Sequence, residues 1–187
     1  LSIFFKTIIL RCTNLRFFFW PIRHLGMLYL LIYLKKIFEN SNYKFFLFDG
    51  ALLGCIRQGA IAGRGKDLDI GMIVETKNDE KKIIKILMNK FRVKKINKSN
   101  FHLIHEKLNI FADLSFFKFA NKKKYLSFYS GIKKKKIIVD SMIILPFKTK
   151  PLYYQNCLIP NNSKLILKIL YGDKFLIPHK KSQLFLN

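Results

Sequence analysis

Two aspartates separated by one residue, Asp67 and Asp69, are the strongest candidates for chemistry in this sequence. Successive side chains of a β-strand point to opposite faces, so in a strand the two carboxylates would share one face and Leu68 would lie on the other. Two like charges at this spacing repel each other, and a hard divalent cation such as Mg²⁺ or Mn²⁺ would convert that repulsion into binding. The pair therefore predicts a metal site. The alternative is a strand end whose acids simply face water.

A third acid, Asp113, stands in the run 108–117, where apolar residues alternate as they do in a strand. As the lone acid of a largely apolar strand, Asp113 is a candidate to complete the metal site. The alternative is a carboxylate that turns out to water, and Asp140, in a later apolar run, is a weaker rival. His102 and His105 are three residues apart, so in a strand they face opposite sides and make poor joint ligands. We expect both histidines to be structural.

The residues before the acid pair form a strand, a turn and a helix that could position a ligand. Residues 45–48 are an apolar, aromatic run that predicts a buried strand, and Asp49-Gly50 is a turn signal. A short helix is predicted over 51–57, and a strand over 66–74 follows a loop with several glycines. Glycine lets a ligand approach the backbone, and a helix start presents unpaired N–H groups. This order predicts a site for an anion beside the acids.

The other segments predict an α/β (α+β) fold, a mixed sheet flanked by helices, and the length of 187 residues suits one domain. A buried helix is predicted over 24–39, and a second helix over 79–90 is capped by Asn78 or Asp79. The remaining predicted elements are strands at 92–96, 101–106 and 108–117, a hairpin tip at 125–136, a strand at 137–145, a loop at 157–163 and a helix at 164–171.

The composition is strongly basic, with 35 Lys and Arg against 11 Asp and Glu and a formal net charge of +24. Such a charge is typical of nucleic-acid binding. Here the basic residues lie in scattered lysine runs, and the sequence lacks the combined aromatic and basic signatures of known nucleic-acid-binding modules. We therefore expect no nucleic-acid partner. The three cysteines show no CxxC spacing and are odd in number, so no disulfide framework is indicated.

Residues 1–22 form an apolar and basic N-terminal segment whose role the sequence leaves open. Lys6, Arg11 and Arg16 interrupt its apolar run, whereas a membrane-spanning helix needs about 20 mostly apolar residues. A cleaved signal and a basic amphipathic segment are the two alternatives. Membrane association through this segment, or through a segment before Leu1, is a further expectation.

Three motifs stand around the acid pair, namely Gly50-Ala51-Leu52-Leu53-Gly54, Arg57 and Lys66-Asp67-Leu68-Asp69-Ile70-Gly71. They resemble the motifs of the fukutin and LicD-type proteins, a branch of the nucleotidyltransferase fold. The resemblance is specific over residues 45–75 and weaker elsewhere. A later block that ends in Leu170-Tyr171-Gly172 resembles the end of the family's domain, so we place the domain at residues 23–180. Two positions depart from the family pattern. Ala51 replaces a small hydroxyl residue, and Gly63-Arg64-Gly65 replaces a Pro-Trp sequence.

The resemblance implies transfer of a phospho-alcohol group, such as ribitol phosphate or phosphocholine, from a CDP-linked donor to a hydroxyl of a glycan or glycoprotein. It implies Mg²⁺ or Mn²⁺ held by Asp67, Asp69 and Asp113, with Asp113 also accepting the proton of the acceptor. In a eukaryote it implies a Golgi or secretory-pathway membrane. The alternative is a catalytically inactive, basic binding domain on the same scaffold. The residues implied in donor binding are Gly50, Ala51, Gly54, Arg57 and Lys66, and Arg64 is a further candidate.

Overall fold

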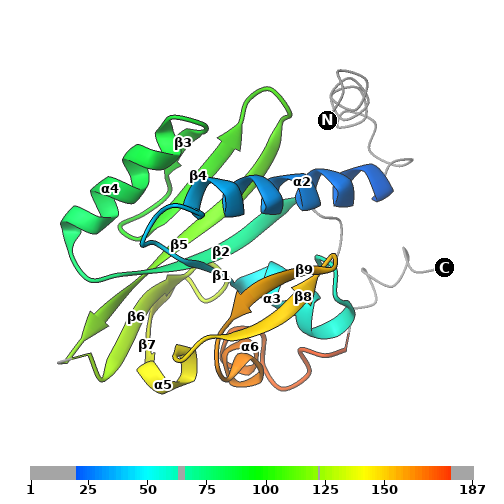
Figure 1. Ribbon diagram of the computed structural model, residues 1–187. Helices are drawn as coiled ribbons and strands as arrows, with labels where there is room; N and C mark the ends of the chain where they lie inside the picture. The colour runs from blue at the N-terminus through cyan, green and yellow to red at the C-terminus, as the bar shows by residue number, and fades with distance from the viewer. Residues whose placement is uncertain (1–19, 63–65, 122, 178–187) are drawn as a thin grey trace.

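The computed structural model describes residues 20–62, 66–121 and 123–177 (Figure 1). In chain order the elements are α2 (Trp20–Phe38), β1 (Phe45–Leu47), α3 (Asp49–Gln58), β2 (Asp67–Val74), α4 (Lys77–Met88), β3 (Arg92–Lys95), β4 (Asn100–His105), β5 (Ile110–Ala120), β6 (Tyr125–Ser130), β7 (Lys135–Asp140), α5 (Ser141–Ile144), β8 (Lys148–Leu152), β9 (Gln155–Ile159) and α6 (Ser163–Tyr171).

β2 and β5 are the central strands of a seven-stranded sheet. Five strands follow the order β1-β2-β5-β4-β3, and β5 also pairs with β6, which in turn pairs with β7. β2 and β5 run parallel, whereas the other pairs of this sheet are antiparallel. The predicted fold class, a mixed sheet flanked by helices, is confirmed.

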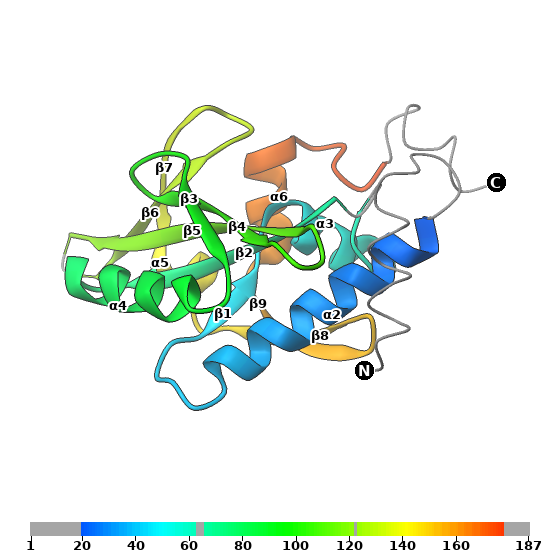
Figure 2. The ribbon, with the colours of Figure 1, turned by 90° about the horizontal axis from the view of Figure 1, so that it is seen from above.

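The two faces of the sheet have different coverings. Figure 2 shows α2 and α4 on one side of the sheet and α6 on the other. The face under α2 is apolar, and there Gly26 of α2 packs close to the side chain of Ile110 in β5. Because side chains alternate along a strand, the opposite face of β2 and β5 carries Asp67, Asp69 and Asp113. Farther along the strands the acid face is apolar as well, because Phe46 and Phe117 are completely buried there over Gly71, so the acids occupy only one end of this face.

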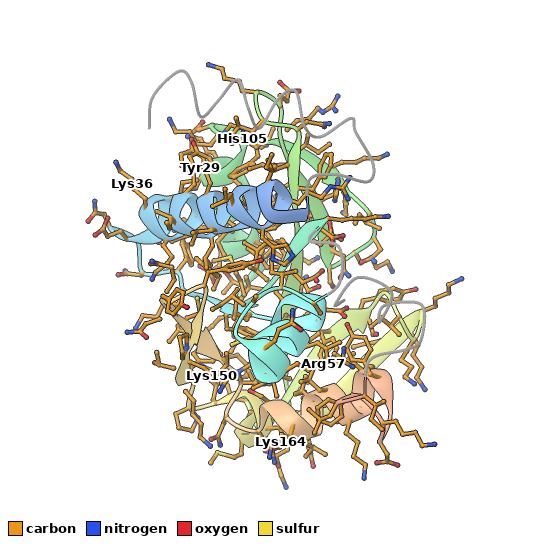
Figure 3. All side chains as sticks on the ribbon, turned by 90° about the vertical axis from the view of Figure 1, so that its right-hand side faces the viewer. Tyr29, Lys36, Arg57, His105, Lys150 and Lys164 are labelled. Carbon is orange, nitrogen blue, oxygen red and sulfur yellow. The ribbon has the colours of Figure 1, made fainter. Side chains whose placement is uncertain are left out.

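α2 is apolar almost all round, as expected for a helix that is buried on several sides. Leu30 and Leu34 are completely buried. Tyr29 and Tyr33 pack against His105 of β4 with their rings nearly perpendicular to the imidazole, and Figure 3 shows Tyr29 on this helix with His105 next to it. His105 thus belongs to the packing between helix and sheet.

α4 begins two residues before its predicted start, because Thr76 caps it rather than Asn78 or Asp79. The Thr76 hydroxyl accepts a hydrogen bond from the backbone N–H of Asp79 at 3.1 Å, and the Asp79 carboxylate accepts one from the N–H of Thr76 at 3.0 Å. This reciprocal pair is a capping box. Asp79 is therefore the third residue of the helix and not its cap.

The strand predicted over 137–145 ends at Asp140, because this residue caps the short helix α5. The Asp140 carboxylate accepts a hydrogen bond from the N–H of Met142 at 2.8 Å. Asp140, the alternative to Asp113, therefore serves as the N-cap of α5.

β8 and β9 form a separate two-stranded sheet. β9 includes residues 157–159, which the sequence predicted to be the start of a loop at 157–163. The turn residues Tyr153 and Tyr154 have φ values of 50° and 63°, a conformation for which hairpin turns usually use Asn or Gly. Contacts from elsewhere in the chain stabilise this turn. The N–H of Tyr153 donates to the carbonyl of Gly59 at 2.7 Å, and its hydroxyl pairs with His24. Because these contacts are non-local, the local sequence did not indicate the hairpin.

The predicted N-terminal segment, residues 1–22, lies outside the described residues except for its last three. Those three form the start of α2, which begins at Trp20 rather than at the predicted His24. None of the helices that the structure describes has both the length and the apolar character needed to cross a membrane.

Gly71→Ala should lower the free energy of unfolding by about 1–3 kcal/mol, because adding a methyl group to a filled core displaces its neighbours. A Cβ at residue 71 would lie 2.4 Å from the ring of Phe46 and 2.9 Å from that of Phe117. Urea denaturation measures the difference. Gly131→Ala is the matched control, since a Cβ there meets no atom within 4 Å. Equal losses for both variants would contradict the close packing over Gly71.

Candidate active site

The parallel pairing of β2 with β5 brings the three predicted acids to one place. The register pairs Asp69 directly with Asp113, and Asp67 lies two residues earlier on the same strand as Asp69. Paired residues of neighbouring strands point to the same face, so all three side chains lie on the face turned away from α2. They interact electrostatically, since Asp67 and Asp113 both contribute to the raised pKa of Asp69, after desolvation.

The start of α3 lies directly against Asp69. The N–H of Phe48 donates to the backbone carbonyl of Asp69 at 3.2 Å, and α3 begins at the next residue. The Asp69 carboxylate accepts a hydrogen bond from the backbone N–H of Ala51. A Cβ on Gly50 would lie 2.8 Å from Oδ2 of Asp69, so this approach requires glycine. The anion observed at this helix start is thus a carboxylate of the protein itself, and a ligand phosphate there stays a prediction.

Asp113 has a partner that the sequence analysis did not assign. β4 pairs His102 directly with Asp113, and Nδ1 of His102 lies 2.5 Å from Oδ1 of Asp113. The His102 ring also stacks on Phe111, with 5.2 Å between the ring centroids. The two histidines face opposite sides, as expected, and His102 contacts a predicted site residue, whereas its role stays a prediction. No local pattern reveals this contact, because it depends on the register between two strands.

A fourth acid, Asp49, belongs to the same cluster, although the sequence analysis treated it only as part of a turn. It is the first residue of α3, and its carboxylate accepts a hydrogen bond from the hydroxyl of Tyr171 in α6. The charge of Asp49 contributes to the raised pKa of Asp69, after desolvation. The sequence signal that could have indicated Asp49 was a polar residue directly after a buried strand.

Burial and mutual repulsion raise the pKa values of three of these carboxyl groups. For Asp49, Asp67 and Asp69 the largest cause is desolvation, which disfavours the charged form. Neighbouring carboxylates raise the three pKa values further, whereas the hydrogen bond from Tyr171 lowers that of Asp49. Burial also raises the pKa of Tyr171 well above its ordinary value. The site therefore concentrates negative charge in a place where ionisation is costly.

Two of the residues predicted for donor binding, Ala51 and Gly54, are packed within the protein, whereas Lys66 is exposed. Ala51 is completely buried, so its methyl group presents no surface to a ligand. Gly54 permits close packing, because a Cβ there would lie 2.2 Å from the backbone of Ala60. Lys66 is exposed directly before β2, and its charge partly offsets the desolvation and repulsion that raise the pKa of Asp67.

Arg57 contacts the C-terminal part of the described chain. Its guanidinium donates to the backbone carbonyls of Phe175 and Ile177, the second at 3.3 Å. Figure 3 shows Arg57 where α3 lies next to α6. A contact between Arg57 and a phosphate stays a prediction, and Arg64 lies outside the described residues.

The donor chemistry of the acid face fits a hard divalent cation, because such ions prefer carboxylate oxygens. Within residues 20–62, 66–121 and 123–177, no group of three His, Cys, Asp or Glu side chains is already arranged to hold a metal ion. Three of the four carboxylates contact a partner in the protein instead, namely Ala51, His102 and Tyr171. A cation would therefore have to compete with these partners and draw the carboxylates together.

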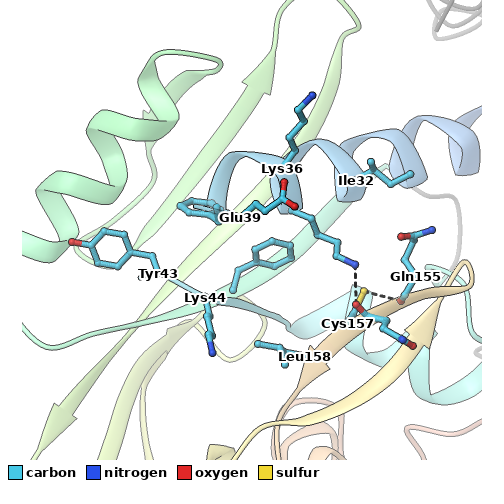
Figure 4. A pocket seen from close by; sticks show the side chains of 12 residues that line it. Ile32, Lys36, Glu39, Tyr43, Lys44, Gln155, Cys157 and Leu158 are labelled. Carbon is cyan, nitrogen blue, oxygen red and sulfur yellow. Dashed lines mark hydrogen bonds between the residues drawn. The ribbon is translucent and has the colours of Figure 1, made fainter. Parts of the chain in front are cut away.

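A cavity of about 500 Å³ is lined by the end of α2, by β1 and by β9 (Figure 4). Its lining includes Tyr43, Lys44 and Cys157, and across it Nζ of Lys35 donates to the carbonyl of Asn156 at 3.0 Å. None of the four clustered aspartates lines this cavity. The residues predicted to carry the chemistry therefore lie outside this cavity.

Comparison with known proteins shows the family of this chain. The model of the family described as LicD/FKTN/FKRP, nucleotidyltransferase domain, matches residues 42–162, which is well over half of the chain. The crystal structure of the lincosamide antibiotic adenylyltransferase LnuA with lincomycin bound is similar in fold, with a TM-score of 0.54 and 13% sequence identity. The similarity covers 82% of this chain and 90% of that one. No curated protein matches the sequence. The matched range contains all four clustered aspartates, whereas Tyr171 lies beyond it.

Asp69→Asn should raise the melting temperature of the metal-free protein at neutral and higher pH. The folded-state pKa of Asp69 lies well above 3.8, so its ionised form destabilises the folded protein above that pKa. This cost decreases as the pH falls below the raised pKa and is gone only near the unfolded-state value of about 3.8, so the advantage of the variant should shrink in parallel. Melting curves in EDTA from about pH 8 to about pH 5 measure both effects.

Asp79→Asn is the control, and it should change the melting temperature in the opposite direction. The hydrogen bond with the Thr76 side chain lowers the pKa of Asp79, so its ionised form stabilises the fold. That variant should melt at a lower temperature at neutral pH and approach the wild type at acid pH. If Asp69→Asn also melted at a much lower temperature, the ionised Asp69 would be needed to hold the start of α3.

Proposed function

Because this chain belongs to the LicD/FKTN/FKRP nucleotidyltransferase-domain family, we propose that it is a metal-dependent transferase of phospho-alcohol groups. The proposed donor is a CDP-linked alcohol that carries ribitol phosphate or phosphocholine, and the proposed acceptor is a hydroxyl of a glycan or glycoprotein. The observation that carries the proposal is the acid face, where the register of β2 and β5 holds Asp67, Asp69 and Asp113 together. The net charge of +24 is compatible with an anionic donor and an anionic acceptor.

In the proposed reaction the oxygen of the acceptor hydroxyl attacks the phosphorus atom that bears the alcohol. The bond from this phosphorus to the oxygen that bridges the two phosphates breaks, and CMP leaves with that oxygen. Asp113 accepts the proton of the hydroxyl. Mg²⁺ or Mn²⁺ would neutralise the charge on the phosphoryl oxygens. Asp67 and Asp69 are the residues that would hold the ion, with Asp113 as the third.

His102 would assist Asp113 by holding its carboxylate in place. Nδ1 of His102 contacts Oδ1, which leaves the second oxygen of Asp113 for a ligand or for the proton. The stacking of the His102 ring on Phe111 restricts the imidazole, so the contact also limits rotation of the carboxylate.

An inactive binding domain on the same scaffold is the second candidate. Two observations favour it. Arg57 is engaged with backbone carbonyls, and the described residues hold no group of three side chains arranged for a metal ion. Metal dependence separates the two candidates, because a domain that only binds need not hold a divalent ion.

A thermal-shift series tests the proposal directly. Mn²⁺ together with CDP-choline or CDP-ribitol should raise the melting temperature, since a ligand at about 100 times its Kd stabilises the folded state by about 2.7 kcal/mol. Each compound without Mn²⁺ should have a much smaller effect. An equal shift without Mn²⁺ would support the binding domain, and no shift with any compound would contradict the transferase proposal for this donor class.

Asp113→Asn should reduce transfer by roughly 10²–10⁴-fold, because the amide cannot accept the proton of the acceptor. Release of CMP from the donor in the presence of an acceptor glycan measures the rate. Asp173→Asn is the matched control, since the side chain of Asp173 is 76% exposed and pairs with Lys168 at the surface. If both variants transferred at the wild-type rate, Asp113 would have no part in the reaction.

A further inference from the structure

The hydroxyl of Tyr171 connects α6 to the acid face by donating a hydrogen bond to Oδ1 of Asp49. The two residues are 122 positions apart in the sequence, and both are partly buried. In the part of the chain that the structure describes, Tyr171 is the one side chain that donates to this carboxylate. Because the hydroxyl has a single proton to give, the second oxygen of Asp49 keeps its lone pairs for another partner.

The helix dipole does not explain why an acid stands at position 49. A negative charge in the first turn of a helix is ordinarily stabilising. At the start of α3, however, the N–H of Ala51 already donates a hydrogen bond to the carboxylate of Asp69, which supplies that negative charge. Asp49 also has a φ of 42°, a conformation that is uncommon for residues other than glycine and often marks functional sites. A fourth carboxylate beside three others adds repulsion, so the stability of the fold gives no reason for it.

Nor is the contact needed to attach α6. Arg57 also links α3 to the segment after α6 through the carbonyls of Phe175 and Ile177. Ile166, Leu167 and Leu170 of α6 are completely buried, and burial of such side chains stabilises the docking of a helix more than a single polar contact does.

We propose that Asp49 is a fourth acidic residue of the transfer site and that Tyr171 is its positioning residue. The inference rests on the proposed function and extends it to a helix outside the matched range 42–162. Tyr171 fixes Oδ1 of Asp49, and the second oxygen is presented to the same divalent cation as Asp69. Loss of the hydroxyl leaves the carboxylate in place but free to turn away from the other acids.

Calorimetric titration of the full chain with Mn²⁺ alone tests the proposal. Tyr171→Phe should weaken Mn²⁺ binding roughly 10- to 100-fold, the usual effect of removing a partner that orients a metal ligand. Asp49→Asn should have at least as large an effect, and asparagine also tolerates the left-handed backbone. The double variant should be no weaker than Asp49→Asn, because Tyr171 acts only through Asp49. Tyr154→Phe is the matched control, since Tyr154 is 99% exposed, and it should bind as the wild type does.

The melting temperature of each metal-free variant separates positioning from structure. A structural contact alone would lower the melting temperature of Tyr171→Phe and leave the Mn²⁺ affinity of the folded protein unchanged, which would overturn the inference. Wild-type affinity in Asp49→Asn would overturn it too. If the wild type bound Mn²⁺, and Tyr171→Phe and Asp49→Asn bound it as tightly as the control Tyr154→Phe, the proposed function would stand without the fourth acid. If the wild type itself did not bind Mn²⁺, the metal-dependent function would fail, and the inference with it.

Discussion

The approach of the Asp69 carboxylate to the start of α3 is the interaction on which the rest of the site depends. It requires glycine at position 50, because a side chain there would collide with Oδ2 of Asp69. It also requires β1 to end next to β2, so that the first turn of α3 meets the carboxylate. The N–H groups of that turn carry partial positive charge and stabilise the carboxylate. The three neighbouring acids act in the opposite direction.

The other face of the sheet makes this concentration of charge tolerable. Each unit by which a pKa is raised represents about 1.4 kcal/mol of differential interaction. Complete burial of one Leu or Ile side chain contributes about 1.5–3 kcal/mol. Leu68, Ile70 and Leu114 are completely buried on the opposite face of the same two strands. Burial of these side chains stabilises, from the opposite face, the two strands that hold the acids together.

Much of this site could be predicted from the sequence, because residue types and spacing indicated the acids, although the pairing of β2 with β5 that joins them is non-local. Alternation along a strand places Asp67 and Asp69 on one face, and a lone acid in a later apolar strand indicated Asp113 as their neighbour. The residues that contact these acids could not be predicted in the same way. His102 reaches Asp113 through the register between β4 and β5, and Tyr171 reaches Asp49 through the packing of α6. Neither contact leaves a local pattern, and the same is true of the hairpin at Tyr153.

The distance along the chain between Asp49 and Tyr171 also sets an order of events during protein synthesis. A ribosome adds about 5–20 residues per second, so the 122 positions between them take roughly 6–24 s to translate. All four clustered acids are made before the donor of Asp49 exists. Until Tyr171 has been made, the carboxylate of Asp49 lacks the hydroxyl that donates to it in the folded protein. The acid face can therefore reach the arrangement described here only after α6, the last of the described helices, has been made.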